Sequence, residues 1–375
     1  MSAGGLLSQA AGQLLIIGFE ATEMTSRLRS LLTRVQPAGV ILFARNIKTA
    51  PQTWQLLREC KKCVAAPLFT CVDVEGGTVD RFRDVLGPTP SAAEVFATGD
   101  RKLFRRHGHI IGTHCRSLGF NLDFAPVLDL AFESSRAVMG SRAVSANPRE
   151  AIAYARNFLA GLGASAVLGC GKHFPGLGEG KLDSHHELPV IEKSLRKLWA
   201  EDLLPYRALR RILPLVMISH ATYPQVTHDR TPASLSRVWI GDILRTRIGY
   251  RNLIVSDDLE MGGVLSAAPV EEAAVQFIRA GGDLCLVCHR EDYILQTYEE
   301  VVKSAERDEQ FARRVAQSSR RVLAFKKKRA KHLRLPARAP SQTAIDKLGR
   351  SLWEFSEQVR LESLKYENDR RRPRA

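Results

Sequence analysis

Short, mostly apolar runs alternate with amphipathic stretches along most of this chain. The runs are four to six residues long, and about eight of them recur between stretches with apolar residues at helical spacing. Short runs without polar alternation are typical of strands buried on both faces, and a 3.6-residue periodicity predicts helices. The predicted strands cover residues 14–19, 39–43, 68–72, 121–124, 166–170, 215–219, 253–256 and 284–288.

Helix signals occur between these strands and after the last of them. Residues 192–212 are predicted as one helix that Pro205 kinks or interrupts. Ser234 or Ser236 is predicted to cap the helix that reaches residue 248. The other predicted helices cover residues 25–35, 50–63, 101–118, 148–162, 271–280, 292–305, 310–328 and 343–366.

This alternation predicts parallel strands with helices on the outside. A doubly wound sheet remains possible, but about eight repeats over about 290 residues fit a closed (β/α)8 barrel better. We therefore expect an α/β protein with a TIM-like barrel catalytic domain in residues 1–335. Residues 336–375 are expected to form a basic C-terminal extension, partly helical or disordered. In such a barrel, chemistry gathers at the carboxyl ends of the strands.

The distribution of charge along the chain bears on whether the protein binds an anionic partner. The 375 residues carry a formal charge of +15, and residues 326–375 supply +9 of it, with 15 Lys and Arg against 6 Asp and Glu. The rest of the chain is therefore close to balanced. A non-enzymatic binder of nucleic acid or of an anionic surface through this tail is one alternative. The tail lacks interleaved aromatic residues and contains acids, which favours a solvated helix.

Cysteine usage and the apolar runs indicate the compartment. Seven cysteines without the spacing of a disulfide framework predict reduced thiols and a cytoplasmic location. Cys60 and Cys63, and Cys285 and Cys288, have CxxC spacing, but we interpret them as core cysteines rather than haem ligands. No apolar run is long enough to span a bilayer, and no lysine or arginine precedes the first one.

A polar, glycine-rich segment, residues 171–188 (GKHFPGLGEGKLDSHHEL), follows the apolar run at 166–170. Glycines let a loop bend while the strand fixes its root. Asp183 and His185 stand two residues apart, so in an extended loop the carboxylate can accept a hydrogen bond from the imidazole and raise its basicity. Such a pair can donate a proton and then remove one. An aspartate that caps a turn beside a surface histidine fits the spacing equally well.

A metal site is another interpretation of this segment. Its candidate ligands are Asp183, His185, His186 and Glu187. Neighbouring ligands rarely converge on one ion, and no helical i,i+4 histidine pair is present, so we expect no metal here.

Two carboxylates, Asp257 and Asp258, follow the predicted strand at 253–256. Asp257 comes directly after the strand, so it is the better candidate for an inward-pointing nucleophile that attacks an anomeric carbon. Asp258 is expected to cap the turn, and capping by both residues is the alternative.

Further charged residues stand at other predicted strand ends. Asp73 and Arg81 flank a Gly-Gly turn, and Arg142 lies in the GSR motif. Carboxylates and guanidinium groups at a barrel mouth suit sugar hydroxyls, which need fixed donors and acceptors. A structural salt bridge is the competing interpretation of each arginine.

Together, these motifs resemble those of the single-domain bacterial β-N-acetylhexosaminidases of glycoside hydrolase family 3 that act in peptidoglycan recycling. The resemblance covers roughly residues 13–288. It rests on DVEGGTVDRFR (73–83), FAPVLDL (124–130), GSR (140–142), GKHFPG (171–176), DSH (183–185), PASLS (232–236) and SDDLEM (256–261).

The resemblance implies a (β/α)8-like barrel that hydrolyses terminal β-linked N-acetylglucosamine with retention, without a metal or organic cofactor. It implies Asp257 as the nucleophile, His185 as the general acid/base and Asp183 as its partner. The sugar-binding residues that it implies are Asp73, Arg81, Arg142, Lys172 and His173. Two positions depart from the family pattern: Leu177 replaces the second histidine of KHFPGHG, and Thr78 replaces the arginine of EGGR.

We therefore expect a cytoplasmic, monomeric exo-β-N-acetylglucosaminidase that acts on muropeptide-derived GlcNAc-anhydro-MurNAc. No nucleic-acid partner and no membrane span are expected. A β-N-acetylglucosaminide phosphorylase and a β-glucosidase of the same family are the alternatives. Phosphorolysis is the nearer one, because a histidine acid/base does not repel phosphate as a second carboxylate would.

Overall fold

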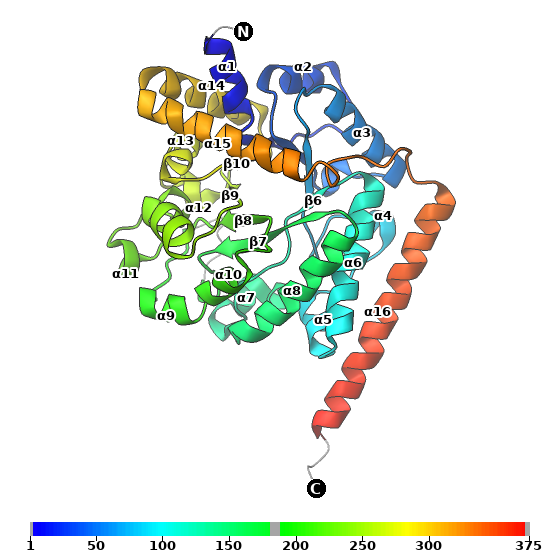
Figure 1. The fold of residues 1–375 in the computed structure, drawn as a ribbon. Helices are drawn as coiled ribbons and strands as arrows, with labels where there is room; N and C mark the ends of the chain where they lie inside the picture. The colour runs from blue at the N-terminus through cyan, green and yellow to red at the C-terminus, as the bar shows by residue number, and fades with distance from the viewer. Residues whose placement is uncertain (1–2, 181–187, 372–375) are drawn as a thin grey trace.

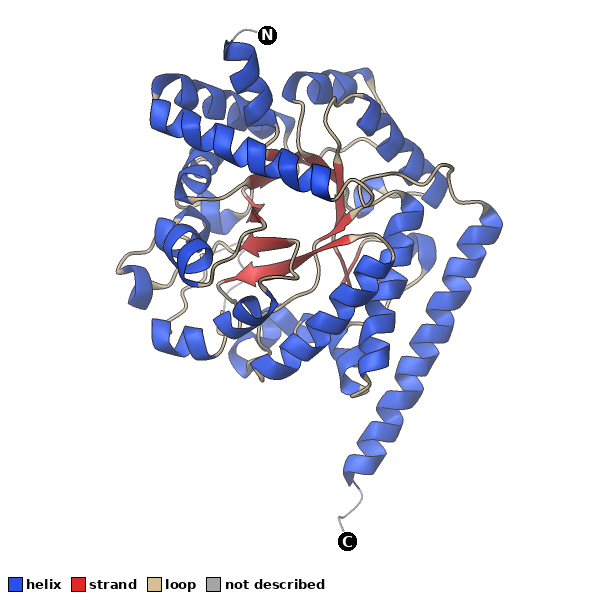
Figure 2. Cartoon of the chain, viewed as in Figure 1, coloured by secondary structure: helices blue, strands red, loops and turns tan. Residues whose placement is uncertain are grey.

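The computed structural model describes residues 3–180 and 188–371 of the chain (Figure 1). Eight parallel strands within these residues close into a barrel in the order β1-β10-β9-β8-β7-β6-β3-β2, and helices surround it (Figure 2). The expected (β/α)8 fold is confirmed. The barrel strands are β1 (Leu15–Ile17), β2 (Gly39–Ile41), β3 (Phe69–Val72), β6 (Leu122–Asp123), β7 (Leu168–Phe174), β8 (Leu215–Ile218), β9 (Leu253–Asp258) and β10 (Leu284–Val287).

Helices and one hairpin connect these strands. The α-helices are α1 (Ala3–Gly12), α2 (Ser26–Val35), α3 (Ala50–Lys62), α4 (Arg83–Leu86), α5 (Ala92–Ala97), α6 (Arg101–Leu118), α7 (Arg136–Met139), α8 (Pro148–Ala164), α9 (Leu195–Ala200), α10 (Leu203–Leu209), α11 (Pro224–Thr227), α12 (Gly262–Leu265), α13 (Val270–Ala280), α14 (Glu291–Arg307), α15 (Glu309–Lys328) and α16 (Gln342–Arg371). The 3-10 turns are η1 (Ala44–Asn46), η2 (Glu133–Ser135), η3 (Gly140–Arg142) and η4 (Ala233–Leu235), whereas η5 (Val238–Arg247) is a π-helix. The antiparallel hairpin consists of β4 (Val74–Gly76) and β5 (Val79–Asp80). None of the helices in the described part of the chain is both long and apolar enough to cross a membrane.

Helix α15 lies across the amino-terminal end of the barrel (Figure 1). Its residues Val322 and Phe325 join the apolar side chains of the barrel interior, among them Phe69. Lys326 donates a hydrogen bond of 2.9 Å to Gln13, which precedes β1. These side chains fill the barrel interior at this end, and in such a barrel the site is expected at the carboxyl ends of the strands.

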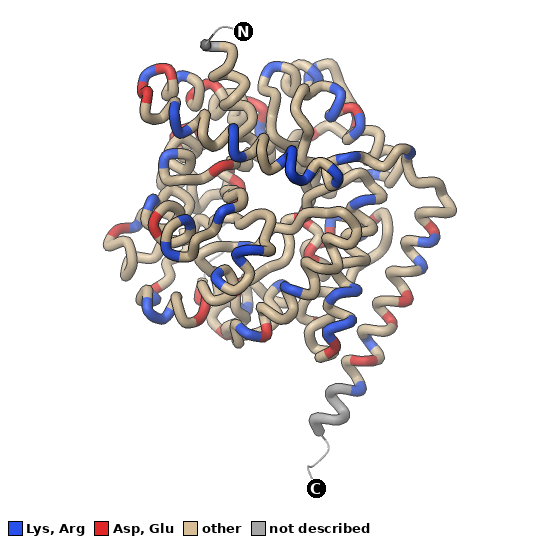
Figure 3. Tube along the Cα trace, viewed as in Figure 1, with Lys and Arg blue, Asp and Glu red and all other residues tan. Residues whose placement is uncertain are grey.

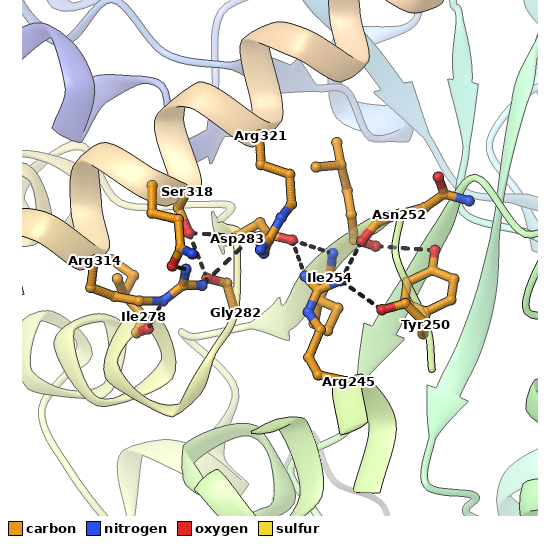
Figure 4. Close-up of polar contacts among 12 residues, drawn as sticks. Arg245, Tyr250, Asn252, Ile254, Ile278, Gly282, Asp283, Arg314, Ser318 and Arg321 are labelled. Atoms are coloured by element: carbon orange, nitrogen blue, oxygen red, sulfur yellow. Dashed lines mark hydrogen bonds and ion pairs between the residues drawn. The ribbon is translucent and has the colours of Figure 1, made fainter. Parts of the chain in front are cut away.

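A buried carboxylate fastens α15 to the barrel. Asp283, directly before β10, is surrounded by Arg245, Arg314 and Arg321 (Figure 4). The distances from Arg314 and Arg321 are 3.6 and 2.7 Å, and the amide of Ile254 donates at 3.0 Å. Because α15 carries Arg314 and Arg321, these contacts tie the closing helix to β9 and β10.

Helix α16 lies along the side of the barrel (Figure 1). Leu352, Phe355 and Val359 are at most 3% exposed, and this stripe packs against α4, α5 and α6. The remaining surface of the helix carries charges of both signs (Figure 3). The helix thus packs on the barrel through one face, while the domain boundary at residue 335 stays a prediction.

The predicted interruption of the helix over residues 192–212 is confirmed, but its predicted location at Pro205 is wrong. The structure has two helices, α9 and α10, and the break falls at Glu201 and Asp202. Pro205 lies in the first turn of α10 rather than at the break. The amide hydrogen that proline lacks has no partner in a first helical turn, so Pro205 is accommodated there.

The capping prediction for the next helix is also wrong. Arg237 is the residue before η5, and no side chain caps this helix. Ser234 lies in the turn η4, and its hydroxyl is 2.8 Å from Nδ1 of His220. The sequence shows a serine ahead of a helix, but it does not show that a buried histidine is its partner.

Strand β7 extends beyond the predicted residues 166–170. It continues through Phe174, so Lys172 and His173 are strand residues rather than loop residues. The carbonyl of Lys172 accepts a hydrogen bond of 2.7 Å from the amide of Leu128. Polar and glycine residues resemble a loop in sequence, but at a barrel mouth a strand can present polar side chains while its backbone stays paired.

Candidate active site

Six residues predicted for the site surround one cavity at the carboxyl ends of the strands. They are Asp73, Arg81, Arg142, Lys172, His173 and Asp257. The cavity encloses about 160 Å³, below the roughly 300 Å³ at which sites for drug-sized ligands begin. The cavity is therefore small.

The other two predicted site residues, Asp183 and His185, lie outside the described residues, as do His186 and Glu187. The chain on the near flank of this segment reaches the cavity, because Leu177 lines it. On the far flank, the carbonyl of Pro189 accepts a hydrogen bond of 2.8 Å from Thr222, just after β8.

Lys172 is the centre of an ion-pair network on the cavity floor. Its Nζ lies 2.7 Å from Oδ1 of Asp73 and 2.6 Å from Oε1 of Glu75. Burial alone lowers the pKa of Lys172, but the two carboxylates outweigh burial and raise that pKa. Lys172 therefore stays protonated at neutral pH.

Glu75 joins Lys172 to Arg142. Its carboxylate accepts hydrogen bonds of 2.8 and 2.9 Å from Nε and Nη2 of Arg142. Burial alone raises the pKa of Glu75, but the charges of Arg142 and Lys172 hold it well below the usual range. The network thus presents fixed charges of both signs to the cavity, which suits the donors and acceptors of a sugar.

His173 is oriented by Asp129. Its Nδ1 lies 2.7 Å from Oδ2 of Asp129, and its amide donates to the same oxygen at 3.1 Å. The second carboxylate oxygen accepts the amide of Leu177 at 2.7 Å. Because an ionised carboxylate only accepts hydrogen bonds, Nδ1 of His173 carries a hydrogen. Asp129 therefore fixes both the direction of the ring and the nitrogen that is protonated.

Sequence reasoning assigned no role to Glu75 or Asp129, although both stand inside quoted motifs. Glu75 lies two positions after Asp73, and in extended backbone this spacing places both side chains on one face. That signal was available in the sequence. Asp129 is found only from the fold, because its partner His173 is 44 positions further along the chain.

Asp257 lies near the end of β9, which extends through Asp258 rather than ending at residue 256. Its Oδ1 accepts the amide of Asp258 at 2.9 Å. Burial alone raises the pKa of Asp257, but His173 and His220 outweigh burial and hold the pKa below its ordinary value. An ionised carboxylate in the cavity wall is what nucleophilic attack on an anomeric carbon requires.

One wall of the cavity was not expected from the sequence. Asp258 accepts the amide of Glu260 at 3.1 Å, as a turn-capping residue does, and its other oxygen lies 3.2 Å from Nε2 of His289. The His289 ring stacks on Phe43 with 5.3 Å between centroids. The guanidinium of Arg81 lies over the same Phe43 ring at 5.7 Å. These side chains come from distant segments, so spacing in sequence does not reveal them.

Residues 6–325 match the model of the glycosyl hydrolase family 3 N terminal domain. The chain belongs to glycosyl hydrolase family 3. The resemblance expected from the motifs is thereby confirmed, and so is the class of glycoside hydrolase.

Relatives within family 3 agree on one type of enzyme. A protein named Beta-hexosaminidase from Bordetella avium (strain 197N) is 38% identical over 278 residues, which are 72% of this chain and 79% of that protein. A β-N-acetylglucosaminidase from Paenibacillus sp. str. FPU-7 matches with a TM-score of 0.87 and 32% identity, over 94% of this chain and 68% of that chain. NagZ from Neisseria gonorrhoeae, solved with N-trifluoroacetyl-D-glucosamine, matches with a TM-score of 0.75 and 29% identity, over 93% of this chain and 98% of that chain.

Proposed function

We propose that this family 3 chain is a retaining exo-β-N-acetylglucosaminidase. The observation that carries the proposal is the single cavity in which Asp257 shares a wall with the Asp73–Lys172–Glu75–Arg142 network. The relatives named β-hexosaminidase and β-N-acetylglucosaminidase support N-acetylglucosamine as the sugar.

The proposed mechanism is a double displacement. The carboxylate of Asp257 attacks the anomeric carbon while His185, oriented by Asp183, protonates the leaving oxygen, so a glycosyl ester forms as the aglycone departs. A water molecule then loses a proton to His185 and attacks the same carbon, which releases the sugar and regenerates Asp257. Two inversions at this carbon restore the β configuration.

The flanks of residues 181–187 support His185 as the acid/base. Leu177 lines the cavity before this segment. Glu179 and Lys193, on opposite sides of the segment, form an ion pair of 3.3 Å, and Lys193 is also held by Asp202 at 2.7 Å. Both ends of the segment are therefore fastened to the same part of the molecule.

We propose that the natural substrate is GlcNAc-anhydro-MurNAc and that the enzyme acts on it in the cytoplasm. The small cavity fits one terminal sugar. All seven cysteines are unpaired, which is typical of a reducing compartment. Those in the CxxC spacings are largely core residues, because Cys60, Cys285 and Cys288 are buried.

Incubation of the protein with GlcNAc-anhydro-MurNAc, with mass analysis of the products, tests the proposal. Free N-acetylglucosamine is expected both with and without phosphate. Release of N-acetylglucosamine 1-phosphate would make the enzyme a phosphorylase instead. A higher kcat/KM on a chromogenic β-glucoside than on the β-N-acetylglucosaminide would make it a β-glucosidase.

A further inference from the structure

The end of the barrel opposite the active site carries a long run of positive charge. Residues 310–345 contain 11 Lys and Arg and no Asp or Glu. They cover α15 after its first residue, the connection to α16 and the first residues of α16, and Figure 3 shows Lys and Arg recurring along this part of the chain. Charge of one sign on one face attracts an anionic partner unless the rest of the protein neutralises it.

Four of these 11 cations are already engaged within the domain. Arg314 and Arg321 face the buried Asp283. Arg313 forms an ion pair of 2.7 Å with an acid one turn earlier in α15, and Lys326 is buried. The other seven form no ion pair with a carboxylate of residues 3–180 and 188–371; they are Arg320, Lys327, Lys328, Arg329, Lys331, Arg334 and Arg338.

Cations of two neighbouring helices join this run. Lys61, near the end of α3, donates to the carbonyl of Leu333 at 2.5 Å, and Arg116, near the end of α6, donates to the carbonyl of His332 at 3.0 Å. Leu333 is 6% exposed and packs with apolar side chains of the barrel interior. Both hydrogen bonds end on neutral oxygens, so they fasten the α15–α16 connection and add positive charge without neutralising any.

The cations of this cluster lie close enough to disfavour one another. Burial and the charge of Arg116 lower the pKa of Lys61 to about 8. Burial and two neighbouring cations, Arg329 and Arg116, lower the pKa of His332. The helix dipole accounts for lysines in the last turn of α15 but not for the cations beyond its end. A bound anion would relieve the repulsion among them.

We propose that this basic face docks the enzyme on an anionic phospholipid surface. The basic face consists of the seven unpaired cations of residues 320–338 together with Lys61, Lys62 and Arg116. Phospholipid headgroups present many negative charges in one plane, and each Lys or Arg near that plane adds to the attraction. Leu323, 40% exposed on α15, adds an apolar contact at the level of the headgroups.

Two features favour a lipid surface over a nucleic acid. The aromatic residues among 310–345 are Phe311 and Phe325, and both are buried, so no ring is available to stack on a base. Helix α15 also packs on the barrel along its apolar side, through Val315 and Val322. It is therefore not free to enter the major groove of a duplex. Its 20 residues span roughly 30 Å, which suits contact with a broad surface.

Docking through the basic face leaves the active site accessible. Helix α15 lies across the amino-terminal end of the barrel, whereas the residues of the active-site cavity stand at the carboxyl ends of the strands (Figure 1). The cavity and the basic face share no residue. A substrate can therefore reach the cavity from the aqueous side while the enzyme is bound.

Co-sedimentation of the full-length protein with phospholipid vesicles tests this proposal. The vesicles contain phosphatidylcholine alone or with about 30% phosphatidylglycerol, in about 0.1 M or about 0.5 M NaCl. We expect the protein to partition onto the anionic vesicles at the lower salt concentration and not onto phosphatidylcholine alone. The partition coefficient should fall at least about tenfold at the higher salt concentration, because the attraction is electrostatic.

Two variants, each with four substitutions, separate the basic face from net charge. Replacing four exposed cations of the face by Gln should lower the partition coefficient at least about tenfold at the lower salt concentration. Replacing four exposed cations near the barrel mouth should keep it within about twofold of the wild type. The face variant is Lys327→Gln, Lys328→Gln, Lys331→Gln and Arg334→Gln, and the control is Lys48→Gln, Arg101→Gln, Lys102→Gln and Arg149→Gln.

Lys62→Glu probes the same face from α3 and should lower the partition coefficient about threefold. Melting curves establish that each variant is folded, and the binding measurement requires no substrate, so its outcome does not depend on the proposed function. Equal partition of the wild type, the face variant and the control would contradict the proposal. Tighter binding to duplex DNA or single-stranded RNA than to the anionic vesicles, lost in the face variant, would assign the face to a nucleic acid instead.

Discussion

The carboxylate of Glu75 accepts two hydrogen bonds, of 2.8 and 2.9 Å, from the guanidinium of Arg142. Replacing Glu75 by Gln removes the charge and turns one acceptor into a donor that faces other donors. We expect KM on a chromogenic β-N-acetylglucosaminide to rise at least tenfold, and the free energy of unfolding to fall by about 3 kcal/mol. Kinetics and urea titration measure these effects.

Glu133 provides the control for this variant. It pairs with Arg136 at 3.4 Å on the surface, so Glu133→Gln should change stability by less than about 1 kcal/mol. Equal KM values in Glu75→Gln and the wild type would show that the network does not position the sugar.

The same pair predicts how stability depends on pH. Because the pKa of Glu75 in the folded protein is well below the ordinary 4.5, the unfolded chain binds this proton more readily. The stability that Glu75 contributes is fully present above about pH 4.5 and is lost as the pH falls below it. Between about pH 5 and 3, the Tm of the wild type should fall more steeply than that of Glu75→Gln. Parallel curves would contradict this account.

Asp129 is predicted to act through His173. In Asp129→Asn, the side chain keeps one acceptor but loses the charge that holds Nδ1–H of His173, so the ring is free to turn. Losing a charge-assisted hydrogen bond of about 1.5–3 kcal/mol corresponds to a roughly ten- to hundredfold fall in kcat/KM. Because Asp129 accepts from two backbone amides as well, Tm should also drop. The double variant His173→Gln/Asp129→Asn should have a kcat/KM only slightly below that of His173→Gln alone. Additive losses in kcat/KM would show that Asp129 does not act through His173.

Asp283 is predicted to matter for stability and not for catalysis. Removing its charge leaves Arg245, Arg314 and Arg321 without their carboxylate. Asp283→Asn should therefore cost about 3–5 kcal/mol of unfolding free energy. At a temperature where the variant is folded, KM should not change, because Asp283 lies at the other end of β10 from the cavity.

Asp308 is the matched control for Asp283. It pairs with Arg279 at 2.6 Å on the surface and accepts amide hydrogens at the start of α15. Asparagine preserves such a cap, so Asp308→Asn should leave the free energy of unfolding nearly unchanged. If both variants lost similar amounts of unfolding free energy, the burial of Asp283 would not explain its contribution to stability.

The barrel was predictable because its strands are short and apolar, while its helices repeat every 3.6 residues. Helix α6 was predicted at residues 101–118 and found there. Prediction failed where tertiary partners override local preference. Lys172 and His173 continue β7 although they look like loop residues, and Ser234 is engaged by His220 instead of capping a helix.

The candidate site was predictable only where a motif carried it. Asp73, Arg142 and Asp257 meet at one cavity as the strand ends implied. The pairing of Asp258 with His289 depends on how β9 and β10 lie side by side, and no spacing in sequence encodes that. The same holds for the groove between α16 and the β4–β5 hairpin, which brings residues near 80 and 360 together.

The central claim is that Asp257 becomes covalently bonded to the sugar. The test is incubation with a 5-fluorinated N-acetylglucosaminyl fluoride. Its ring fluorine slows both displacements, but the good fluoride leaving group lets the first proceed faster than the second, so the glycosyl-enzyme accumulates. Mass mapping of the peptides should place one sugar adduct on Asp257. An inactivated enzyme whose adduct lies on another residue, or full turnover by Asp257→Ala, would contradict the mechanism.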